Sequence, residues 1–202
     1  ADIEWRLARD GVRVIKGRAR LDGPETVVVQ LADGDMRLAA DAVLVATGAS
    51  PRTLAQAQPD GERILTWEQV YDLTELPSKL IVVGSGVTGA EFASAYLHLG
   101  VEVVLVSSRE RVLPGEDADA AQLLEDVLRR EGMVVMDSSR MQAVQRQGDE
   151  VVVSLTDGRT VTGSHCLLAL GSIPHTADMG LEEAGVRLDE GGFIQVDRVS
   201  RT

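Results

Sequence analysis

Short apolar runs, each closed by a glycine or a polar turn, divide the chain into a series of predicted strands and helices. Continuous apolar runs predict buried strands, and alternation of apolar and polar residues predicts half-buried strands. In the N-terminal part, strands are predicted at 12–15, 26–30 and 41–46, with a turn at 32–35 leading into a further strand. Ser50-Pro51-Arg52 is expected to leave the strand, because proline cannot continue a hydrogen-bonded ladder.

Residues 53–78 follow as an expected connector. Thr66 and Gln69 have the spacing of a helix-capping pair within it. The stretch Leu76-Pro77-Ser78 closes the segment.

The pattern then changes to alternating buried strands and helices. A strand at 80–83 precedes a helix at 88–99, whose apolar face is expected at Phe92, Ala95, Tyr96 and Leu99 and which Gly100 ends. The predicted elements that follow are a strand at 101–106, a helix at 116–130 ended by Gly132, and a strand at 133–136.

The last third of the chain has a different pattern, in which short strands are separated by turns. Strands at 141–146, 151–155 and 160–162 predict an antiparallel meander, followed by a buried strand at 166–170 and a short strand at 193–196. The sequence of meander, apolar strand, Gly and Pro occurs twice, in TVVVQ…AVLVATGASPR and in VVVSL…CLLALGSIPH. Either two similar nucleotide-binding units or a coincidence of common strand endings explains it.

These patterns predict an α/β fold. We expect a Rossmann-like, three-layer ββα dinucleotide-binding domain with an antiparallel meander, plus part of a second such domain.

Composition limits the possible partners. The net charge is −12, which argues against a nucleic-acid partner, because such binding requires a basic face. No apolar run approaches the roughly 18 residues of a membrane span. The single cysteine, Cys166, excludes an internal disulfide and favours a cytoplasmic location. Because the N-terminus has neither an initiator Met nor a signal peptide, we expect the chain to come from within a longer protein.

The motif with the clearest chemistry is Gly84-Ser85-Gly86-Val87-Thr88-Gly89, placed between a predicted strand and a predicted helix. Gly84 permits the tight turn, Gly86 lets the backbone approach a pyrophosphate, and Gly89 lets the helix pack closely on the strand. The amides at the helix N-terminus suit phosphate oxygens. This context predicts a dinucleotide site.

The end of the second strand bears on which dinucleotide binds. NAD sites place a carboxylate there for the ribose 2′-hydroxyl, but this chain has Ser107, followed by Ser108 and Arg109. A hydroxyl and a guanidinium suit a 2′-phosphate, which favours NADPH over NADH. Two alternatives stay open: Arg109 and Arg111 could form surface ion pairs, or Glu110 could turn inward and hold the ribose.

Taken together, the segments VIKGRARL, DAVLVATGASPR, LIVVGSGVTGAEFA, VVLVSSRERVLPGED, CLLALGSIPHT and GGFIQVD resemble the pyridine nucleotide-disulfide oxidoreductase family, which includes lipoamide dehydrogenase, glutathione reductase and related quinone reductases. The resemblance implies FAD and NADPH or NADH as cofactors. It also implies these domains: a partial FAD-binding domain at 1–60, a connector at 61–78, an NAD(P)H-binding domain at 79–180 and a return toward the FAD domain at 181–202.

The resemblance also assigns roles to residues. The backbone at Arg18 and Ala19 matches the FAD adenine contact, and Ala46, Thr47 and Gly48 match the strand end beside the flavin cofactor. NAD(P)H contacts are implied at Gly84, Ser85, Gly86, Val87, Thr88, Gly89, Ser107, Ser108, Arg109, Gly171 and, less directly, Met141. Glu91 matches the family glutamate near the nicotinamide and the flavin, although its position also suits a favourable charge at a helix N-terminus. No metal ligand is implied.

The resemblance leaves three readings. The first is an FAD-dependent NAD(P)H oxidoreductase that passes electrons to a quinone, the second is a dihydrolipoamide dehydrogenase or another disulfide reductase, and the third is a stand-alone nucleotide-binding module. For the first two, the family's other parts, including the redox cysteine pair and the C-terminal domain that forms a homodimer, are expected outside this chain. His175 follows Pro174 where the family usually has Asn, and Val87 stands where some members have a flavin-covering Tyr.

Overall fold

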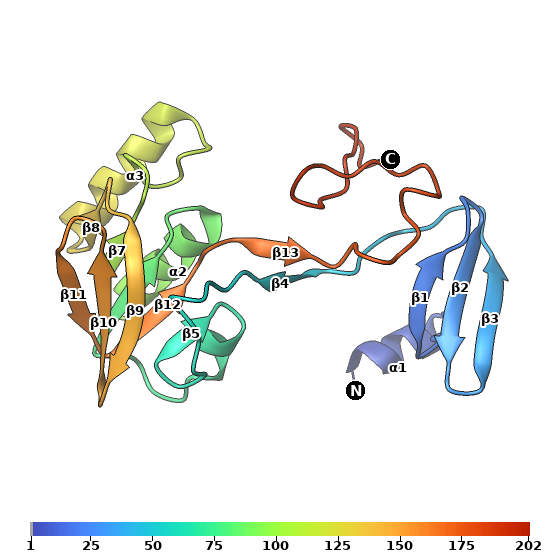
Figure 1. Ribbon diagram of the computed structural model, residues 1–202, viewed down its shortest axis with the longest axis horizontal. Coiled ribbons are helices and arrows are strands. Elements are labelled where there is room, and N and C mark those ends of the chain that lie inside the picture. Colours follow the sequence, from blue (N-terminus) through green and yellow to red (C-terminus); the bar gives the residue numbers. More distant parts are fainter. Residues whose placement is uncertain (1) are drawn as a thin grey trace. The chain divides into compact units, whose positions relative to one another are not determined.

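The computed structural model describes residues 2–202, which form two compact units (Figure 1). Unit 1 comprises residues 2–49 and 173–202, and unit 2 comprises residues 50–172. Unit 1 is therefore built from two separate stretches of chain, with the whole of unit 2 between them in the sequence.

Unit 2 has a parallel five-stranded sheet at its centre, in the order β5-β12-β6-β7-β8. The strands are β5 (Ile64–Thr66), β6 (Lys79–Val83), β7 (Glu102–Val106), β8 (Val134–Met136) and β12 (His165–Leu168). All four pairings in this sheet are parallel, and β6 and β7 align residue for residue from Lys79 opposite Glu102 to Val83 opposite Val106. The expected α/β class is confirmed.

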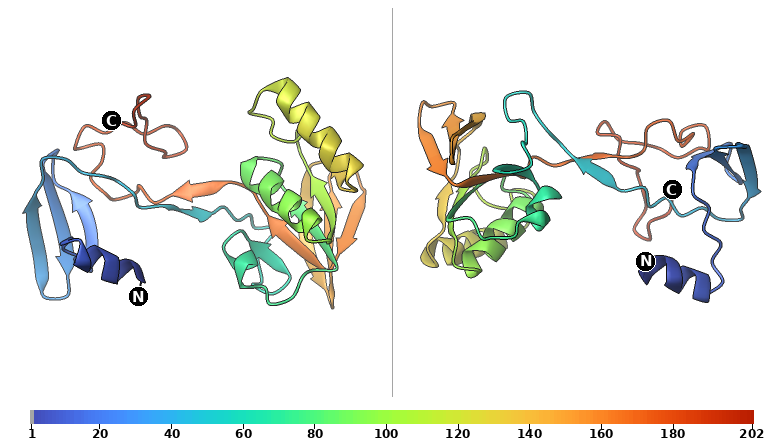
Figure 2. Two further views of the ribbon diagram at one scale, coloured as in Figure 1. Left: turned by 180° about the vertical axis from the view of Figure 1, so that it is seen from behind. Right: turned by 90° about the horizontal axis from the view of Figure 1, so that it is seen from below.

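One face of this sheet is covered by helices and the other by a meander (Figure 2). The helices are α2 (Val87–His98) and α3 (Ala118–Arg130), and the meander consists of β9 (Met141–Gln147), β10 (Glu150–Leu155) and β11 (Thr160–Gly163). Strand β6 illustrates the division, since Leu80 and Val82 pack on the helix side and Ile81 and Val83 on the meander side. Continuous apolar strands of this kind are typical of a parallel sheet buried on both faces.

Helix α2 contacts the sheet through smaller residues than the sequence pattern predicts. Its buried residues are Gly89, Ala90 and Ala93, whereas the expected apolar face is only partly buried and Leu99 is 59% exposed. Small residues face the sheet because they let the helix axis lie close to it, whereas larger side chains would hold the helix away. Gly100 ends the helix with φ +87°, as predicted.

Unit 1 contains helix α1 (Asp2–Arg9) and an antiparallel sheet of β1 (Arg18–Leu21), β2 (Thr26–Leu31) and β3 (Gly34–Ala39). Its C-terminal stretch returns to this sheet, where the Leu21 amide donates to the Met179 carbonyl at 2.7 Å. The two short strands β4 (Ala49–Pro51) and β13 (Ser172–Pro174) pair with each other in a ribbon.

Four predictions in the sequence pattern are wrong. Residues 12–15 and 41–46 are not strands, because no described strand pairs with them, and Leu44 is 90% exposed. Residues 193–196 form only a single bridge, between Leu188 and Ile194. The ladder also continues past Pro51, since the next residue, Arg52, donates its amide to the Gly171 carbonyl at 2.9 Å. Proline is tolerated there because the ribbon has a free edge.

The expected connector contains an element that the pattern does not predict. Strand β5 lies inside it and extends the parallel sheet beside β12. The predicted pair forms its two hydrogen bonds: the Thr66 amide donates to Gln69 Oε1 at 2.9 Å and the Gln69 amide donates to Thr66 Oγ1 at 3.4 Å. The N-cap of the helical turn is nevertheless Glu68 and not Thr66. The helix that follows is one 3-10 turn, η1 (Gln69–Asp72). No helix among residues 2–202 has the length and apolar character needed to cross a membrane.

Candidate dinucleotide site

The loop between β6 and α2 is shaped by close backbone approaches. Gly84 has φ +113°, a left-handed conformation that favours glycine, and a Cβ on it would lie 2.2 Å from the Ala169 carbonyl oxygen. A Cβ on Gly89 would lie 1.8 Å from the Gly84 carbonyl oxygen. Neither position has room for a side chain, because the obstructing atoms belong to the backbone.

Gly86 differs from these two glycines. A Cβ built on it would meet no atom within 4 Å, and its backbone, with φ −69°, is open to any residue. Nothing in the fold of residues 2–202 therefore requires glycine here. A residue without a side chain leaves the front of the loop open to a ligand that touches the backbone.

The same residue begins helix α2 without capping it. Gly86 is the N-cap and offers no side-chain acceptor, and the first amide bonded within the helix is that of Ala90, which donates to the Gly86 carbonyl at 2.9 Å. The amides of Val87, Thr88 and Gly89 thus lie at the positive end of the helix with no helical acceptor. This arrangement suits a diphosphate anion.

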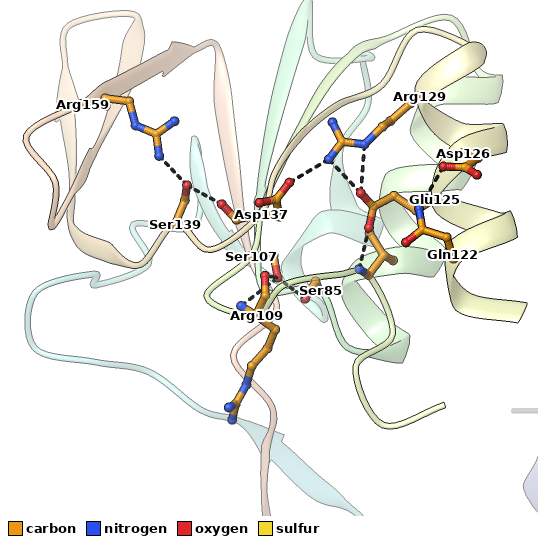
Figure 3. A network of polar contacts seen from close by, with 11 residues as sticks. Ser85, Ser107, Arg109, Gln122, Glu125, Asp126, Arg129, Asp137, Ser139 and Arg159 are labelled. Atoms are coloured by element: carbon orange, nitrogen blue, oxygen red, sulfur yellow. Dashed lines mark hydrogen bonds and ion pairs between the residues drawn. The ribbon is translucent and has the colours of Figure 1, made fainter. Parts of the chain in front are cut away.

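Ser107, at the end of β7, has a buried structural environment. Its side chain is inaccessible to solvent, and its Oγ lies 2.6 Å from Ser85 Oγ, so the two hydroxyls link the ends of β6 and β7. The same oxygen also accepts from the Arg109 amide and donates to the Arg109 carbonyl, each at 3.0 Å. The structure thus places Ser107 in the interior, and Figure 3 shows its contacts with Ser85 and Arg109.

The three residues after Ser108 bear on the alternatives left open by the sequence. Figure 3 shows the Arg109 side chain extending away from Ser107 and Ser85. Within residues 2–202 no ion pair joins Arg109, Glu110 or Arg111 to another side chain. The Arg111 Nε atom is buried and makes no hydrogen bond to another described residue.

A cavity of about 430 Å³ lies where β6, β7 and β12 end and the meander begins. The carboxyl ends of parallel strands are where open α/β sheets bind their ligands. The residues lining it are Leu54, Gln56, Val83, Gly84, Val106, Ser108, Ser139, Arg140, Met141, Gln142, Thr156 and Leu170. Three predicted residues, Gly84, Ser108 and Met141, therefore meet here.

Sequence reasoning missed several polar residues of this cavity, above all Arg140. Arg140 follows strand β8 and directly precedes β9. A usable signal existed, because ligand-contacting residues are expected in the segment after each parallel strand and not only after the first two.

Glu91 lies away from this cavity. It is exposed in the first turns of α2 and lines a groove of about 710 Å³ between α2 and α3, together with Val87. Thr88 is exposed at the same helix end. Among the described residues Glu91 has no ion pair, so its carboxylate is held by no other side chain.

The predicted flavin-side residues belong to unit 1. Arg18 and Ala19 lie on β1, opposite Gln30 and Val29 of β2, and Arg18 also lines a cavity of about 450 Å³. Ala46, Thr47 and Gly48 follow β3 as an exposed segment that belongs to no strand.

His175 fixes part of that segment. Its amide donates to the Gly48 carbonyl at 3.0 Å, and its Nδ1 lies 2.9 Å from the Thr47 carbonyl oxygen. Since a carbonyl only accepts, Nδ1 carries the hydrogen. In unit 2, Gly171 has φ +87° and accepts from the Arg52 amide.

A βαβ unit with a glycine loop and an open helix N-terminus, at the carboxyl ends of parallel strands, defines a dinucleotide-binding protein. The family described as pyridine nucleotide-disulphide oxidoreductase matches residues 1–202, and the chain belongs to this family. FAD and NAD(P)H, the expected cofactors, are those that the family uses.

Curated relatives include a quinone dehydrogenase and dihydrolipoyl dehydrogenases. The chain is 53% identical to an NAD(P)H dehydrogenase (quinone) of Mycobacterium tuberculosis over 100% of its own length and 42% of the relative's. It is 32% identical to a dihydrolipoyl dehydrogenase of Zymomonas mobilis over 99% and 44%, respectively. The chain thus spans less than half the length of these relatives.

Solved structures agree with the fold. The crystal structure of LpdA from Mycobacterium tuberculosis matches with a TM-score of 0.83 and 52% identity over 100% of this chain and 45% of that one. The flavoprotein disulfide reductase RclA of Escherichia coli matches with a TM-score of 0.79 and 24% identity, over 97% of this chain and 45% of that one, and supports the fold alone.

Proposed function

We propose that unit 2 binds NAD(P)H and that unit 1 carries part of an FAD-binding domain. The observation that carries this proposal is the joining of the open glycine loop, through Gly84, to the 430 Å³ cavity. The domain boundaries near residues 60, 78 and 180 stay predictions. The exposed apolar segments 12–15 and 41–46 support the second part, because their pattern is that of strands which a larger sheet would bury.

The residues fit the dinucleotide in its parts. The amides from Val87 to Gly89 would hold the pyrophosphate, and the missing side chain of Gly86 lets it approach. The cavity with Ser108 and Met141 would take the adenosine. Ser85, Ser107 and Arg109 shape the turn beside it, while Glu91 and Gly171 are proposed to lie on the nicotinamide side.

For the whole enzyme we propose electron transfer from NAD(P)H through FAD to a small-molecule acceptor. When bound, NAD(P)H supplies a hydride and FAD passes the two electrons on. The chain's own residues position the two cofactors: Glu91 beside the nicotinamide, and Arg18, Ala19, Ala46, Thr47 and Gly48 along FAD.

We propose a quinone as the acceptor, in line with the name of the relative that is 53% identical. A disulfide such as lipoamide is the alternative, in line with the dihydrolipoyl dehydrogenases. The chain has one cysteine, so a redox pair would have to lie outside its 202 residues. The NADPH preference, a homodimer in the full-length protein and a cytoplasmic location complete the proposal.

Calorimetric titration of the 202-residue chain with NADPH and with NADH tests the nucleotide site. Circular dichroism first establishes that the chain is folded. Binding of either nucleotide with a stoichiometry near one, lost on addition of the other in excess, is the expected result. A folded chain that binds neither would overturn the assignment of unit 2.

A further inference from the structure

The cavity of about 430 Å³ at the ends of β6, β7 and β12, here called the nucleotide cavity, is lined by a single charged side chain. Of the residues that line it, Arg140 alone is charged, and the other lining residues are apolar or neutral and polar. Within residues 2–202 the Arg140 guanidinium has no ion-pair partner. The cavity therefore presents one positive charge and no carboxylate to a ligand.

The turn that carries Arg140 is bound to the turn that ends β7. The Ser139 amide donates to the Ser107 carbonyl at 2.7 Å, and the Ser138 amide donates to the Arg109 carbonyl at 2.8 Å. The carbonyl of Arg140 itself accepts from the Thr156 amide at 2.9 Å. The backbone on both sides of the Arg140 side chain is thus fixed next to the position where a ribose reader is expected.

Side-chain contacts hold the same turn. Ser139 is 1% exposed, and its Oγ donates to the Asp137 carbonyl at 2.8 Å and lies 2.6 Å from an Arg159 guanidinium nitrogen (Figure 3). A guanidinium on so well supported a turn loses less freedom on binding than one on a free loop.

The residue expected to read the ribose is not available for it. Ser107 is buried with its hydroxyl committed to Ser85 and to the Arg109 backbone, and the Arg109 side chain extends away from both serines. A 2′-hydroxyl is best held by a carboxylate, which the cavity lacks, whereas a 2′-phosphate is best held by a guanidinium.

We propose that Arg140 recognises the 2′-phosphate of NADPH and sets the preference for NADPH over NADH, while Ser107 positions the two turns. The proposal rests on the proposed NAD(P)H-binding function of unit 2. It moves the specificity from the segment after β7 to the segment after β8.

The test compares NADPH with NADH, and 2′,5′-ADP with 5′-AMP, by calorimetry on the folded chain and on three variants. Arg140→Gln is expected to raise the Kd for NADPH and 2′,5′-ADP by roughly tenfold to a hundredfold, which is the loss of one charge-assisted contact. The Kd for NADH and 5′-AMP should change by less than about twofold. Arg130→Gln, at the end of α3, removes the same charge outside the cavity and should change none of the four values.

Three outcomes overturn the proposal. An equal loss for all four ligands in Arg140→Gln would mean that Arg140 stacks on the adenine. A selective loss of NADPH binding in Arg109→Gln and not in Arg140→Gln would return the recognition to the β7 turn. Unchanged binding in Arg140→Gln would leave the nucleotide site standing without this residue, whereas a folded chain that binds no ligand at all would overturn the proposed function itself.

Discussion

At the scale of single residues, the three glycines of the loop between β6 and α2 are there for different reasons: the fold requires two of them, and ligand binding would explain the third. Gly84 and Gly89 have no room for a Cβ, whereas Gly86 has open space before it. The motif spacing alone predicts all three glycines, but only the structure divides them into two that the fold requires and one that it does not.

Gly89→Ala and Gly86→Ala form a matched pair. Alanine is favoured over glycine inside a helix, but the 1.8 Å approach to the Gly84 carbonyl should outweigh that gain. We expect Gly89→Ala to lower the free energy of unfolding by about 1–3 kcal/mol, as for an overpacked site. Gly86→Ala should change stability by less than about 0.5 kcal/mol and weaken NAD(P)H binding by about tenfold.

Thermal unfolding and calorimetric titration of both variants provide the measurement. If Gly86→Ala bound NAD(P)H as tightly as the unchanged chain, the loop would not contact the pyrophosphate. If Gly89→Ala were as stable as the unchanged chain, the close approach of helix and loop would be wrong.

At the scale of elements, prediction succeeded for most segments of unit 2 that meet a partner within the chain, although it missed β5, which pairs with β12. Strands β6, β7, β8 and β12 and the meander follow from the apolar pattern, because apolar residues there reflect actual burial. Both helices of unit 2 were also predicted, although the buried face of α2 was not. Segments 12–15 and 41–46 have the same pattern but pair with no strand among residues 2–202, and a strand is defined by pairing and not by pattern. Arg140 was not predicted as a site residue. Its place beside the β7 turn depends on backbone hydrogen bonds between segments about thirty residues apart, which the local pattern does not contain.

Helix α3 is held to the loop before it by one buried carboxylate. Glu125 is 4% exposed; its Oε2 accepts from the Val112 amide and its Oε1 from Arg129 Nε, both at 2.9 Å (Figure 3). Glu125→Ala should lower the free energy of unfolding by about 3 kcal/mol, because it leaves the buried Val112 amide without its acceptor and leaves Arg129 with Asp137 as its remaining partner. Gln122→Ala, on the exposed face one turn earlier, is the control and should stay within about 0.5 kcal/mol. Urea unfolding followed by circular dichroism measures both, and similar losses would contradict the anchoring role.

Strand β12 begins with a histidine whose titration couples to folding. Burial, followed by the nearby Arg63 guanidinium, lowers the pKa of His165, and Arg146 acts in the same direction against the opposing Asp60 carboxylate. Its Nδ1 also lies 3.0 Å from Ser164 Oγ. Because the folded-state pKa is below the ordinary value of about 6.5, the unfolded chain binds more protons as the pH falls through that value.

The free energy of unfolding should therefore decrease as the pH is lowered from 7 toward 5. The His165→Gln variant should show a smaller decrease over the same range. Urea unfolding at several pH values measures both slopes, and equal slopes would mean that His165 does not titrate differently in the two states. Asp60 acts at lower pH: burial opposes its ionisation, but the amides of residues 62–64 and Arg146 lower its pKa overall, so its contribution disappears only in acid.

At the scale of the molecule, the single cysteine lies inside the sheet that carries the proposed nucleotide site, one strand in from its edge. Cys166 is on β12, between β5 and β6, with no exposed surface, and burial raises the pKa of its thiol. A thiol reagent needs an exposed thiolate, so labelling should report opening of the sheet and not local motion.

The rate at which Cys166 reacts with a disulfide reagent that releases a coloured thiolate therefore offers a test of nucleotide binding. This test requires no catalytic turnover. A ligand that binds only the folded state stabilises it, by about 2.7 kcal/mol at a concentration of 100 times Kd. We expect that concentration of NADPH to slow labelling by about a hundredfold when opening is in rapid equilibrium. Adenosine at the same concentration serves as the control, and it should slow labelling far less because it lacks the phosphates that the helix N-terminus binds. Fast labelling without ligand would show that the sheet is not closed around Cys166. Labelling at the same rate with and without NADPH would show that unit 2 does not bind the nucleotide.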